Sequence, residues 1–456
     1  MIDLKKNKTF CPFPFKGAII EPKGEWIQPC CRWDNRAYLD KDLDDEGMIS
    51  INNVSDFNES WSNVRRKMLS GEKVAGCTKC YWQEANGNRS MRENAIAAIQ
   101  NPKWAQGVRG PKGEWGNIAK PRLEYLEIET GRFCNLKCRT CGPGLSTSWD
   151  EDLIDNTEAQ QHFFGEPHPK HNWYTDHKRN ITTNEYIKDM EYDTVKHLLE
   201  VKVTGGEPFL TDAFLGFLDN LVKWDLAKNI VLDVFTNCSF FPKEKYWSIL
   251  PKFKRVYINL SLDGIEQEAE FIRKKSNWKT VLKVSKHWEK LSLDYKNIFV
   301  AISHTISVFN VLSFKKFIVW VYTHFDKKLV NKYITGYTID GNEEHQYGDF
   351  LQVTHVSGPD YLCLSNLNNK VKLKMIDDLK IQREEVDKEL ESIGYSDKSF
   401  VRDYAINKWY TALEKTLKGK GPDCTDLFKV KAEFFDKIRK ENWQEVFPKL
   451  TEVINE

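Results

Sequence analysis

Three cysteines, Cys134, Cys138 and Cys141, form a C-x3-C-x2-C motif just after an apolar-alternating run over residues 123–128. Three thiolates can ligate three irons of a four-iron cluster. The fourth iron then stays open to an outside ligand, which suits a cluster that binds a small molecule and passes it one electron. A zinc site would usually have a fourth Cys or His nearby, and none occurs in residues 142–156. A zinc site or three unrelated thiols remain the alternatives to a cluster from the motif alone.

A second group of cysteines lies near the N-terminus. The turn signal Pro22-Lys23-Gly24 separates two short extended runs and predicts a β-hairpin, with one cysteine before it and a pair after it. A C-x2-C motif then follows a segment with helical apolar spacing over residues 54–69. The combination predicts a four-thiolate site, which either an iron–sulfur cluster or zinc would fit. The candidate ligands are Cys11, Cys30, Cys31, Cys77 and Cys80.

A Gly-Gly-Glu-Pro turn at residues 205–208 follows an extended run over residues 199–204. Two glycines allow the backbone to approach a ligand closely, and the carboxylate of Glu207 can accept a charge-assisted hydrogen bond from an ammonium group. An ordinary strand-to-helix turn is the alternative, because this short motif is weak evidence by itself.

Strand and helix signals alternate through the middle of the chain. Alternating βα units imply parallel strands covered by helices. Five or six units predict an α/β fold with an open, partial (β/α)6 TIM-like barrel, in which chemistry gathers at the carboxyl ends of the strands. A sixth extended run is expected within residues 332–356, after runs at 123–129, 199–204, 230–236, 255–262 and 297–306.

The cysteine triplet followed by Thr204-Gly205-Gly206-Glu207-Pro208 resembles the radical SAM superfamily over roughly residues 119–312. The resemblance implies a [4Fe-4S] cluster on the triplet that binds S-adenosyl-L-methionine (SAM) and cleaves it reductively to a 5′-deoxyadenosyl radical. That radical abstracts hydrogen from the substrate. The chain departs from the family at Thr140, where an aromatic residue often packs near adenine. The resemblance assigns cofactor contacts to Gly205, Gly206, Glu207, Pro208, Asn237, Ser261, Asp263, Arg273 and Asn310.

The N-terminal cysteines resemble the auxiliary-cluster modules called SPASM and twitch domains. Cys11, Gly24, Pro29-Cys30, Cys77 and Cys80 match their pattern in order. Here the module precedes the barrel, whereas in most relatives it follows it. The spacing from Gly24 to Cys30 is one residue longer than usual, so Cys30 and Cys31 compete for one ligand position, and we favour Cys30. A single site fits a twitch domain better and implies one auxiliary iron–sulfur cluster, expected to be [4Fe-4S].

The domain organisation expected from these patterns has three parts. Residues 1–118 form a small cysteine-rich α+β domain with the auxiliary cluster, residues 119–356 form the radical SAM partial barrel, and residues 357–456 form a helical extension. A formal net charge of +1 favours neither a nucleic-acid nor a membrane partner. Eleven cysteines without a signal peptide indicate metal or redox ligands rather than disulfides, and predict a cytoplasmic protein.

The expected substrate follows from the resemblance alone. Relatives with an auxiliary cluster often modify peptides or protein side chains, which sets the first expectation, with a flavodoxin- or ferredoxin-type electron donor. The alternatives are radical modification of a nucleoside, sugar or cofactor precursor, and a non-catalytic metal-binding interaction protein. A segment at residues 161–179 contains four histidines and is interpreted as a surface insertion, a mobile lid or a second metal site.

Overall fold

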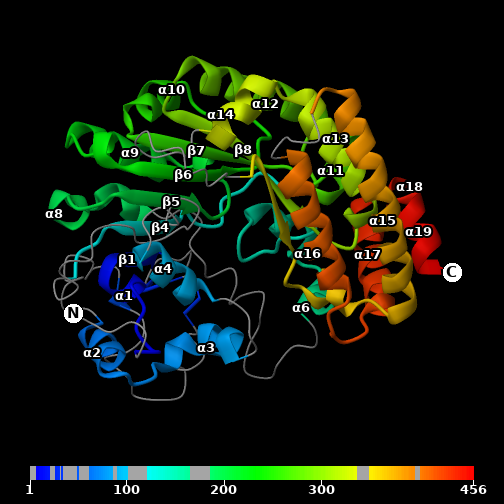
Figure 1. Ribbon diagram of the computed structural model, residues 1–456, viewed down its shortest axis with the longest axis horizontal. Coiled ribbons are helices and arrows are strands. Elements are labelled where there is room, and N and C mark those ends of the chain that lie inside the picture. Colours follow the sequence, from blue (N-terminus) through cyan, green and yellow to red (C-terminus); the bar gives the residue numbers. More distant parts are fainter. Residues whose placement is uncertain are drawn as a thin grey trace.

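The computed structural model describes ten parts of the chain, and Figure 1 shows how they are arranged. They are residues 7–20, 26–30, 32–33, 49–50, 61–85, 90–100, 121–164, 185–335, 349–395 and 401–455. Their strands form one sheet of nine strands in the order β3-β2-β1-β4-β5-β6-β7-β8-β9. The strands are β1 (Gly17–Ile20), β2 (Trp26–Gln28), β3 (Ile49–Ser50), β4 (Tyr125–Glu129), β5 (Glu200–Thr204), β6 (Val231–Thr236), β7 (Arg255–Ser261), β8 (Ile298–Ile306) and β9 (Leu351–His355).

Strands β4 to β9 are parallel and adjacent in chain order. Each lies within a run that the sequence predicts as extended, because strands buried between two layers are rich in Val, Ile and Leu. The sheet is open, since β3 and β9 lie at its two ends. The predicted α/β fold with an open, partial barrel is therefore confirmed.

Helices follow most of the parallel strands and cover the outer face of the sheet (Figure 1). Aromatic side chains fill the layer between strands and helices: Phe209 lies 4.8 Å from Tyr246 and 5.4 Å from Trp288 between ring centroids. These three side chains are fully buried, so they anchor the turn after β5 to the helical layer. The helices of this region are α5 (Asp150–Leu153), α6 (Thr157–Phe164), α8 (Tyr192–Val195), α9 (Asp212–Lys223), α10 (Lys245–Ile249), α11 (Glu266–Ile272), α12 (Trp278–Asp294), α13 (Phe314–His324) and α14 (Lys327–Thr335).

The N-terminal region joins the sheet of the predicted barrel. Strand β1 pairs parallel to β4, with Gly17 opposite Tyr125, while β1 and β2 pair antiparallel. A buried ion pair of 3.0 Å between Lys16 and Glu124 accompanies this junction. The sheet thus crosses the boundary expected near residue 118, and the division into three domains stays a prediction. The helices here are α1 (Phe13–Lys16), α2 (Ser62–Ser70), α3 (Thr78–Ala85) and α4 (Met91–Gln100).

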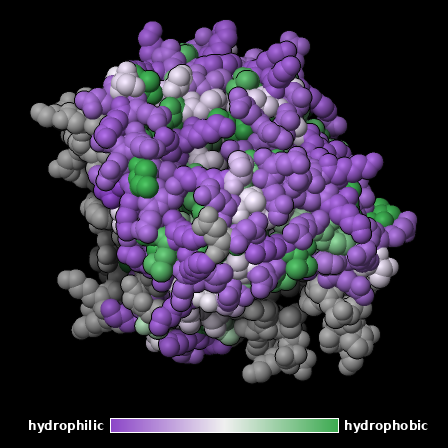
Figure 2. Space-filling model, turned by 90° about the vertical axis from the view of Figure 1, so that its right-hand side faces the viewer, coloured by the Kyte–Doolittle hydropathy of each residue, from purple (hydrophilic) through white to green (hydrophobic). Residues whose placement is uncertain are grey.

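The C-terminal region is helical, as predicted, and packs beside α13 on the side of the molecule away from α1–α4 (Figure 1). Its outer face is mostly hydrophilic with scattered apolar side chains (Figure 2). In the described ranges, no helix combines the length and apolar composition that a bilayer span requires. The helices are α15 (Asn369–Ser392), α16 (Asn407–Leu417), α17 (Thr425–Arg439), α18 (Trp443–Val446) and α19 (Pro448–Asn455).

Candidate functional site

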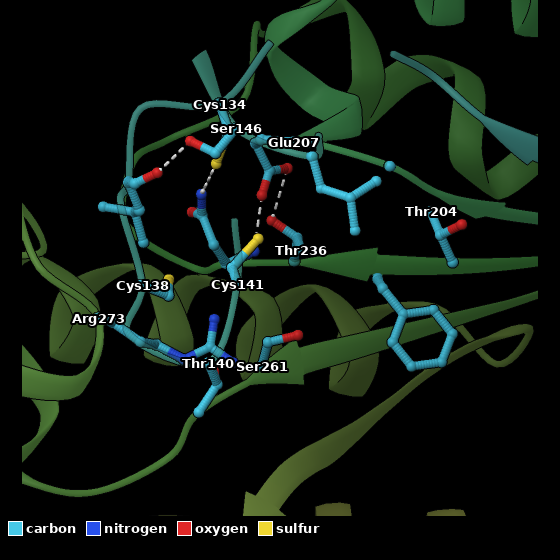
Figure 3. A pocket seen from close by; sticks show the side chains of 16 residues that line it. Cys134, Cys138, Thr140, Cys141, Ser146, Thr204, Glu207, Thr236, Ser261 and Arg273 are labelled. Carbon is cyan, nitrogen blue, oxygen red and sulfur yellow. Dashed lines mark hydrogen bonds between the residues drawn. The ribbon is translucent and has the colours of Figure 1, made fainter. Parts of the chain in front are cut away.

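A cavity of about 180 Å³ lies where the carboxyl ends of β4, β5, β6 and β7 meet (Figure 3). Its lining includes most of the residues to which the sequence assigns chemistry. These are Cys134, Cys138, Cys141, Gly205, Gly206, Glu207, Asn237, Ser261 and Arg273. Segments that are more than a hundred residues apart in the chain therefore converge on one site.

The cysteine loop is held by hydrogen bonds to its own backbone. The Ser148 hydroxyl donates to the carbonyl of Cys134 at 2.9 Å, and the Ser146 hydroxyl donates to the carbonyl of Leu136 at 2.5 Å. Arg132 is buried, donates to the Pro143 carbonyl at 2.9 Å and pairs with Asp150 at 2.6 Å. The side chains that shape the loop thus lie within ten residues of the motif on either side, and no sequence pattern indicated this function for them.

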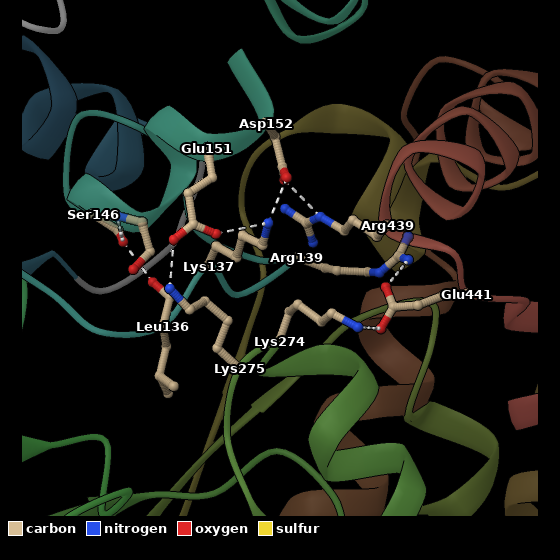
Figure 4. A network of polar contacts seen from close by, with 11 residues as sticks. Leu136, Lys137, Arg139, Ser146, Glu151, Asp152, Lys274, Lys275, Arg439 and Glu441 are labelled. Carbon is tan, nitrogen blue, oxygen red and sulfur yellow. Dashed lines mark hydrogen bonds and ion pairs between the residues drawn. The ribbon is translucent and has the colours of Figure 1, made fainter. Parts of the chain in front are cut away.

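The residues between the cysteines anchor the loop to its surroundings (Figure 4). The Arg139 guanidinium lies 3.9 Å from the ring centroid of Phe271 and pairs with both Asp436 and Glu441, the latter at 2.7 Å. Lys137 pairs with Asp152 at 2.6 Å. Asp152 also accepts a hydrogen bond of 2.7 Å from Arg439 at the end of α17, and Lys274 pairs with Glu441 at 2.8 Å. The C-terminal helices therefore support the cysteine loop directly, a contact that the sequence does not predict.

Burial keeps the cysteine thiols protonated in the absence of a metal. It raises the pKa of Cys134 and Cys138 to about 12 and that of Cys141 to about 11. The positive charge of Arg273 lowers the pKa of Cys138 and Cys141 and so opposes the effect of burial. In the described ranges, no group of three or more His, Cys, Asp or Glu side chains has the geometry of a metal-ion site. Both predicted ligand sets therefore stay predictions.

The two glycines of the Gly-Gly-Glu-Pro turn pack against the cysteine loop. Gly205 has a φ of +118°, and a Cβ there would lie 2.6 Å from the Thr130 nitrogen. A Cβ at Gly206 would lie 2.3 Å from the Phe133 carbonyl oxygen. The backbone nitrogens of Gly206 and Glu207 donate to the carbonyls of Gly131 and Phe133 at 2.7 and 2.8 Å. The close approach that glycine permits is thus made by the neighbouring loop, and the approach of a ligand to these glycines stays a prediction.

Glu207 is a fully buried carboxylate with three hydrogen-bond donors. The backbone nitrogens of Asn237 and Phe209 donate to it at 2.6 and 3.2 Å, and the Thr236 hydroxyl donates at 2.9 Å. A carboxylate has about four acceptor positions, so one remains for a ligand. Burial raises the pKa of Glu207 to about 7, although these hydrogen bonds act in the opposite direction. The expected contact with an ammonium group stays a prediction.

The raised pKa of Glu207 predicts a specific pH dependence of stability. Its folded-state pKa of about 7 exceeds its ordinary value of 4.5. The stability that it contributes is therefore fully present below pH 4.5 and is lost as the pH rises through 7. The loss amounts to about 3 kcal/mol. Urea unfolding of the wild type and of Glu207→Gln is measured between pH 4.5 and 8. The free energy of unfolding of the wild type, relative to that of the variant, is expected to fall by about 3 kcal/mol over this range. Parallel pH profiles would contradict it.

Arg273 projects into the cavity and is positioned by residues behind it. It pairs with Asp263 at 2.7 Å, and the Asp263 carboxylate also accepts a hydrogen bond of 2.8 Å from the backbone nitrogen of Thr305. The Asn310 side chain donates to the carbonyl of Asp263 at 2.8 Å. Asp263 and Asn310 are almost fully buried and support the lining. Pro208 begins the 3₁₀ segment Pro208–Leu210 that follows the turn. The cofactor contacts assigned to these residues stay predictions.

The N-terminal cysteines lie within electrostatic range of one another. Burial is the largest cause that raises the pKa of Cys77, followed by the neighbouring Cys30 and Cys80. Burial also raises the pKa of Cys11 most, with smaller contributions from Cys77 and Cys80. The charge of Arg92 lowers the pKa of Cys11 and Cys77. Arg92 donates to the Phe10 carbonyl at 2.9 Å, so it is fixed beside these thiols, and no sequence motif indicated this position for it. Cys31 lies outside the described residues, as do His168, His171 and His177. His162 stacks on Phe434 with 3.8 Å between ring centroids.

Comparison with known proteins gives one family and several distant structures. The sequence pattern of the radical SAM superfamily matches residues 128–310. A structure of anSMEcpe with bound AdoMet and the Cp18Cys peptide is 19% identical over 60% of this chain and 62% of that chain, with a TM-score of 0.34. SuiB of Streptococcus suis bound to S-adenosylmethionine is 13% identical over 82% of this chain and 67% of that chain, with a TM-score of 0.27.

TYW1 with a lysine-pyruvate adduct is 12% identical over 58% of this chain and 73% of that chain, with a TM-score of 0.25. The match covers 62% of the anSMEcpe chain, so this chain spans less than two thirds of the length of that protein. A search of curated proteins found no match. The matched segment contains the cysteine motif, the Gly-Gly-Glu-Pro turn and the ends of the strands that form the cavity. Residues 128–310, which contain the elements of this site, therefore match the radical SAM superfamily.

Proposed function

We propose that this protein is a radical SAM enzyme whose cofactors meet in the cavity at the ends of β4–β7. One observation carries the proposal: Cys134, Cys138 and Cys141 line the same cavity as the Gly-Gly-Glu-Pro turn, within the segment that matches the superfamily. When bound there, a [4Fe-4S] cluster supplies the electron that cleaves SAM to methionine and a 5′-deoxyadenosyl radical, which abstracts hydrogen from the substrate.

The residues that line the cavity fit this pair of cofactors. The Nε of Arg273 is buried and, in the described part of the chain, has no hydrogen-bond partner. Since Asp263 already holds its Nη2, the remaining N–H groups of the guanidinium are available to the methionine carboxylate. The open acceptor position of Glu207 suits the methionine ammonium group, and the Ser261 hydroxyl suits the ribose. Gly205, Gly206 and Asn237 complete this wall of the cavity, while Asp263, Asn310 and Pro208 support it.

The chain itself orients the cofactors and excludes water. The cysteine loop is fixed by Arg132 on its inner side and by Arg139 on its outer side. Part of the cavity lining is buried, including Glu207, Thr236 and Asn237, and this part limits the access of solvent to a reactive radical. We therefore expect the reacting groups to keep the same relative orientation throughout the reaction.

We also propose that Cys11, Cys30, Cys77 and Cys80 bind an auxiliary iron–sulfur cluster, expected to be [4Fe-4S]. The mutual influence of these thiols on their pKa values supports this set, together with the cysteine pattern of the N-terminal segment. The proposed substrate is a peptide or protein side chain, by resemblance to enzymes with an auxiliary cluster. A flavodoxin- or ferredoxin-type protein is the proposed electron donor.

Loss of one cysteine of the triplet is expected to abolish SAM cleavage. After anaerobic reconstitution the wild type should bind about eight irons per chain, since each four-iron cluster adds four. Cys138→Ala should bind about four irons and form no 5′-deoxyadenosine. Cys363→Ala is the matched control, because this buried thiol belongs to neither set, and it should retain both properties. Deoxyadenosine formation by Cys138→Ala at the wild-type rate would refute the assignment.

Loss of the auxiliary cysteines should distinguish the functions of the two proposed clusters. A Cys77→Ala/Cys80→Ala variant is expected to lose about four irons while it still cleaves SAM in the absence of substrate, because the triplet is intact. Substrate turnover should fall by at least about tenfold, as expected when ligands of a functional metal site are removed. Iron analysis and chromatography of deoxyadenosine and product measure these effects. Zinc in place of iron at this site in the wild type would contradict the proposal.

The substrate class is tested by release of deoxyadenosine. The reconstituted enzyme is incubated with a library of Cys-, Ser-, Lys- and aromatic-containing peptides and, in parallel, with nucleosides, sugars and cofactor precursors. Peptide-dependent stimulation accompanied by a mass change of the peptide supports the proposed class. Stimulation by small molecules alone refutes it and identifies the alternative.

A further inference from the structure

The chain turns sharply at the end of β6, beside the cysteine loop. Cys238 has a φ of 58°, in the left-handed region that non-glycine residues rarely adopt. The backbone nitrogen of Asn237 donates to Glu207 at 2.6 Å on the side of β5. Asn237 itself is buried, with 7% of its surface exposed. These constraints fix the backbone from which the Asn237 side chain extends toward the cysteine loop.

The orientation of the Asn237 amide is determined by its neighbours. The backbone nitrogen of Ser239 donates to Asn237 Oδ1 at 3.0 Å. A backbone N–H can only donate, so the atom that faces it must be the oxygen. The opposite end is therefore the NH₂ group. It donates to Asn135 Oδ1 at 2.9 Å and to the sulfur of Cys134 at 3.8 Å. Each of the two amide hydrogens thus has an acceptor.

A closed ring of polar side chains holds this arrangement. The Asn135 amide donates to the Ser239 hydroxyl at 2.8 Å, and that hydroxyl donates to Asn237 Oδ1 at 2.6 Å. Asn135 follows Cys134 directly in the cysteine motif. The ring therefore ties the first cysteine of the triplet to the end of β6. Both ends of the Asn237 amide are hydrogen-bonded. If one of the other members of the ring were lost, we therefore expect the Asn237 NH₂ group to keep its hydrogen bond to the Cys134 sulfur.

We propose that Asn237 donates a hydrogen bond to the cluster ligand Cys134 and so raises the reduction potential of the cluster, which makes Asn237 a positioning and tuning residue. The proposal rests on the proposed function. A hydrogen bond to a ligating sulfur stabilises the negative charge that the cluster gains on reduction. In the described part of the chain, Cys134 is the cysteine of the triplet whose sulfur accepts a side-chain hydrogen bond. The effect therefore falls on one corner of the cluster.

The test is a redox titration of the reconstituted holoprotein, followed by electron paramagnetic resonance in the absence of SAM. The relevant signal is the one that changes when SAM is added afterwards. Asn237→Leu removes the donor with little change in size. At a fixed potential it should lower the ratio of reduced to oxidised cluster about tenfold, as expected for a hydrogen bond to a charged group. This equals a shift of about 59 mV to lower potential for one electron. Ser239→Ala is the control and should stay within about twofold of wild type, since Asn135 still accepts from Asn237.

Each outcome decides the proposal. A wild-type potential in Asn237→Leu, with or without weaker SAM binding, overturns it and makes Asn237 a ligand contact or a structural residue. If Asn237→Leu loses its iron, the proposal is tested instead by a comparison of Asn237→Asp with the wild type. Electron–nuclear double resonance of the wild type must then show an exchangeable proton coupled to the cluster that is absent from Asn237→Asp. Equal proton couplings in the two proteins overturn the proposal. Failure of the proposed function is seen separately, as a wild type without any SAM-responsive cluster signal.

Discussion

Gly206→Ala is expected to destabilise the protein by more than about 3 kcal/mol and to prevent cluster assembly. A Cβ at this position would lie 2.3 Å from the Phe133 carbonyl oxygen, and that oxygen accepts the hydrogen bond from the Glu207 nitrogen. Both partners are backbone atoms, so no side chain can move aside. The turn and the cysteine loop must therefore separate, which also displaces Cys134 from the cavity.

Urea unfolding and iron analysis after anaerobic reconstitution measure these two effects. Gly358→Ala is the matched control, because a Cβ there would meet no atom within 4 Å. It should change the unfolding free energy by less than about 0.5 kcal/mol. A Gly206→Ala protein with wild-type stability and iron content would show that the turn does not pack on the loop as described.

Arg139→Ala is expected to cost about 3–5 kcal/mol of stability, as found when one partner of a buried ion pair is removed. Arg139 pairs with Asp436 and Glu441, which would be left as buried carboxylates without this partner, and its contact with Phe271 would also be lost. Because Arg139 lies directly after Cys138 in the motif, the iron content should fall as well. Arg139→Lys should recover only part of the stability, since a lysine cannot form the same forked contact.

Lys275→Ala tests whether the effect of Arg139 depends on burial. Lys275 pairs with Glu151 in the same network, but both side chains are exposed, by 38% and 53%. Its loss should cost less than about 1 kcal/mol. Equal effects of the two substitutions on the urea midpoint would show that the C-terminal helices do not hold the cysteine loop through Arg139.

The sequence predicted the parallel strands well, because each buried strand is a short apolar run between helical segments. The runs at 123–129, 199–204 and 230–236 each differ from the observed strands by two residues or fewer at either end. These runs also placed the motifs at the carboxyl ends of the strands, where the cavity is found. Local patterns were sufficient here because each strand pairs with the next one in the chain.

Contacts between distant segments were not predicted. Strand β1 is a four-residue apolar run, and nothing in it indicates that its partner is β4, about a hundred residues away. Asp436 and Glu441 resemble solvated charges in a lysine- and glutamate-rich segment, but they pair with Arg139 across 297 and 302 residues. Such pairs depend on how complete elements pack, which no local periodicity encodes.

The location of several side chains at the site was predicted, while their roles stay predictions. The family resemblance assigned Arg273 and Glu207 to the site, and both line the cavity. The contact of Asn237 with SAM or the substrate stays a prediction, and its amide lies 3.8 Å from the sulfur of Cys134. The orientation of that amide depends on Asn135 and Ser239, which no motif singles out.

Mössbauer spectroscopy of the Cys77→Ala/Cys80→Ala variant, reconstituted with iron-57, tests whether the cluster on Cys134, Cys138 and Cys141 has an open iron. With only the triplet available, we expect one four-iron cluster in which about one iron in four changes its spectrum when SAM is added. That result would show that three protein sulfurs leave a single iron open to the cofactor. A cluster whose four irons are all unaffected by SAM, or a variant that binds no iron, would show that the triplet does not hold a cluster with an open iron.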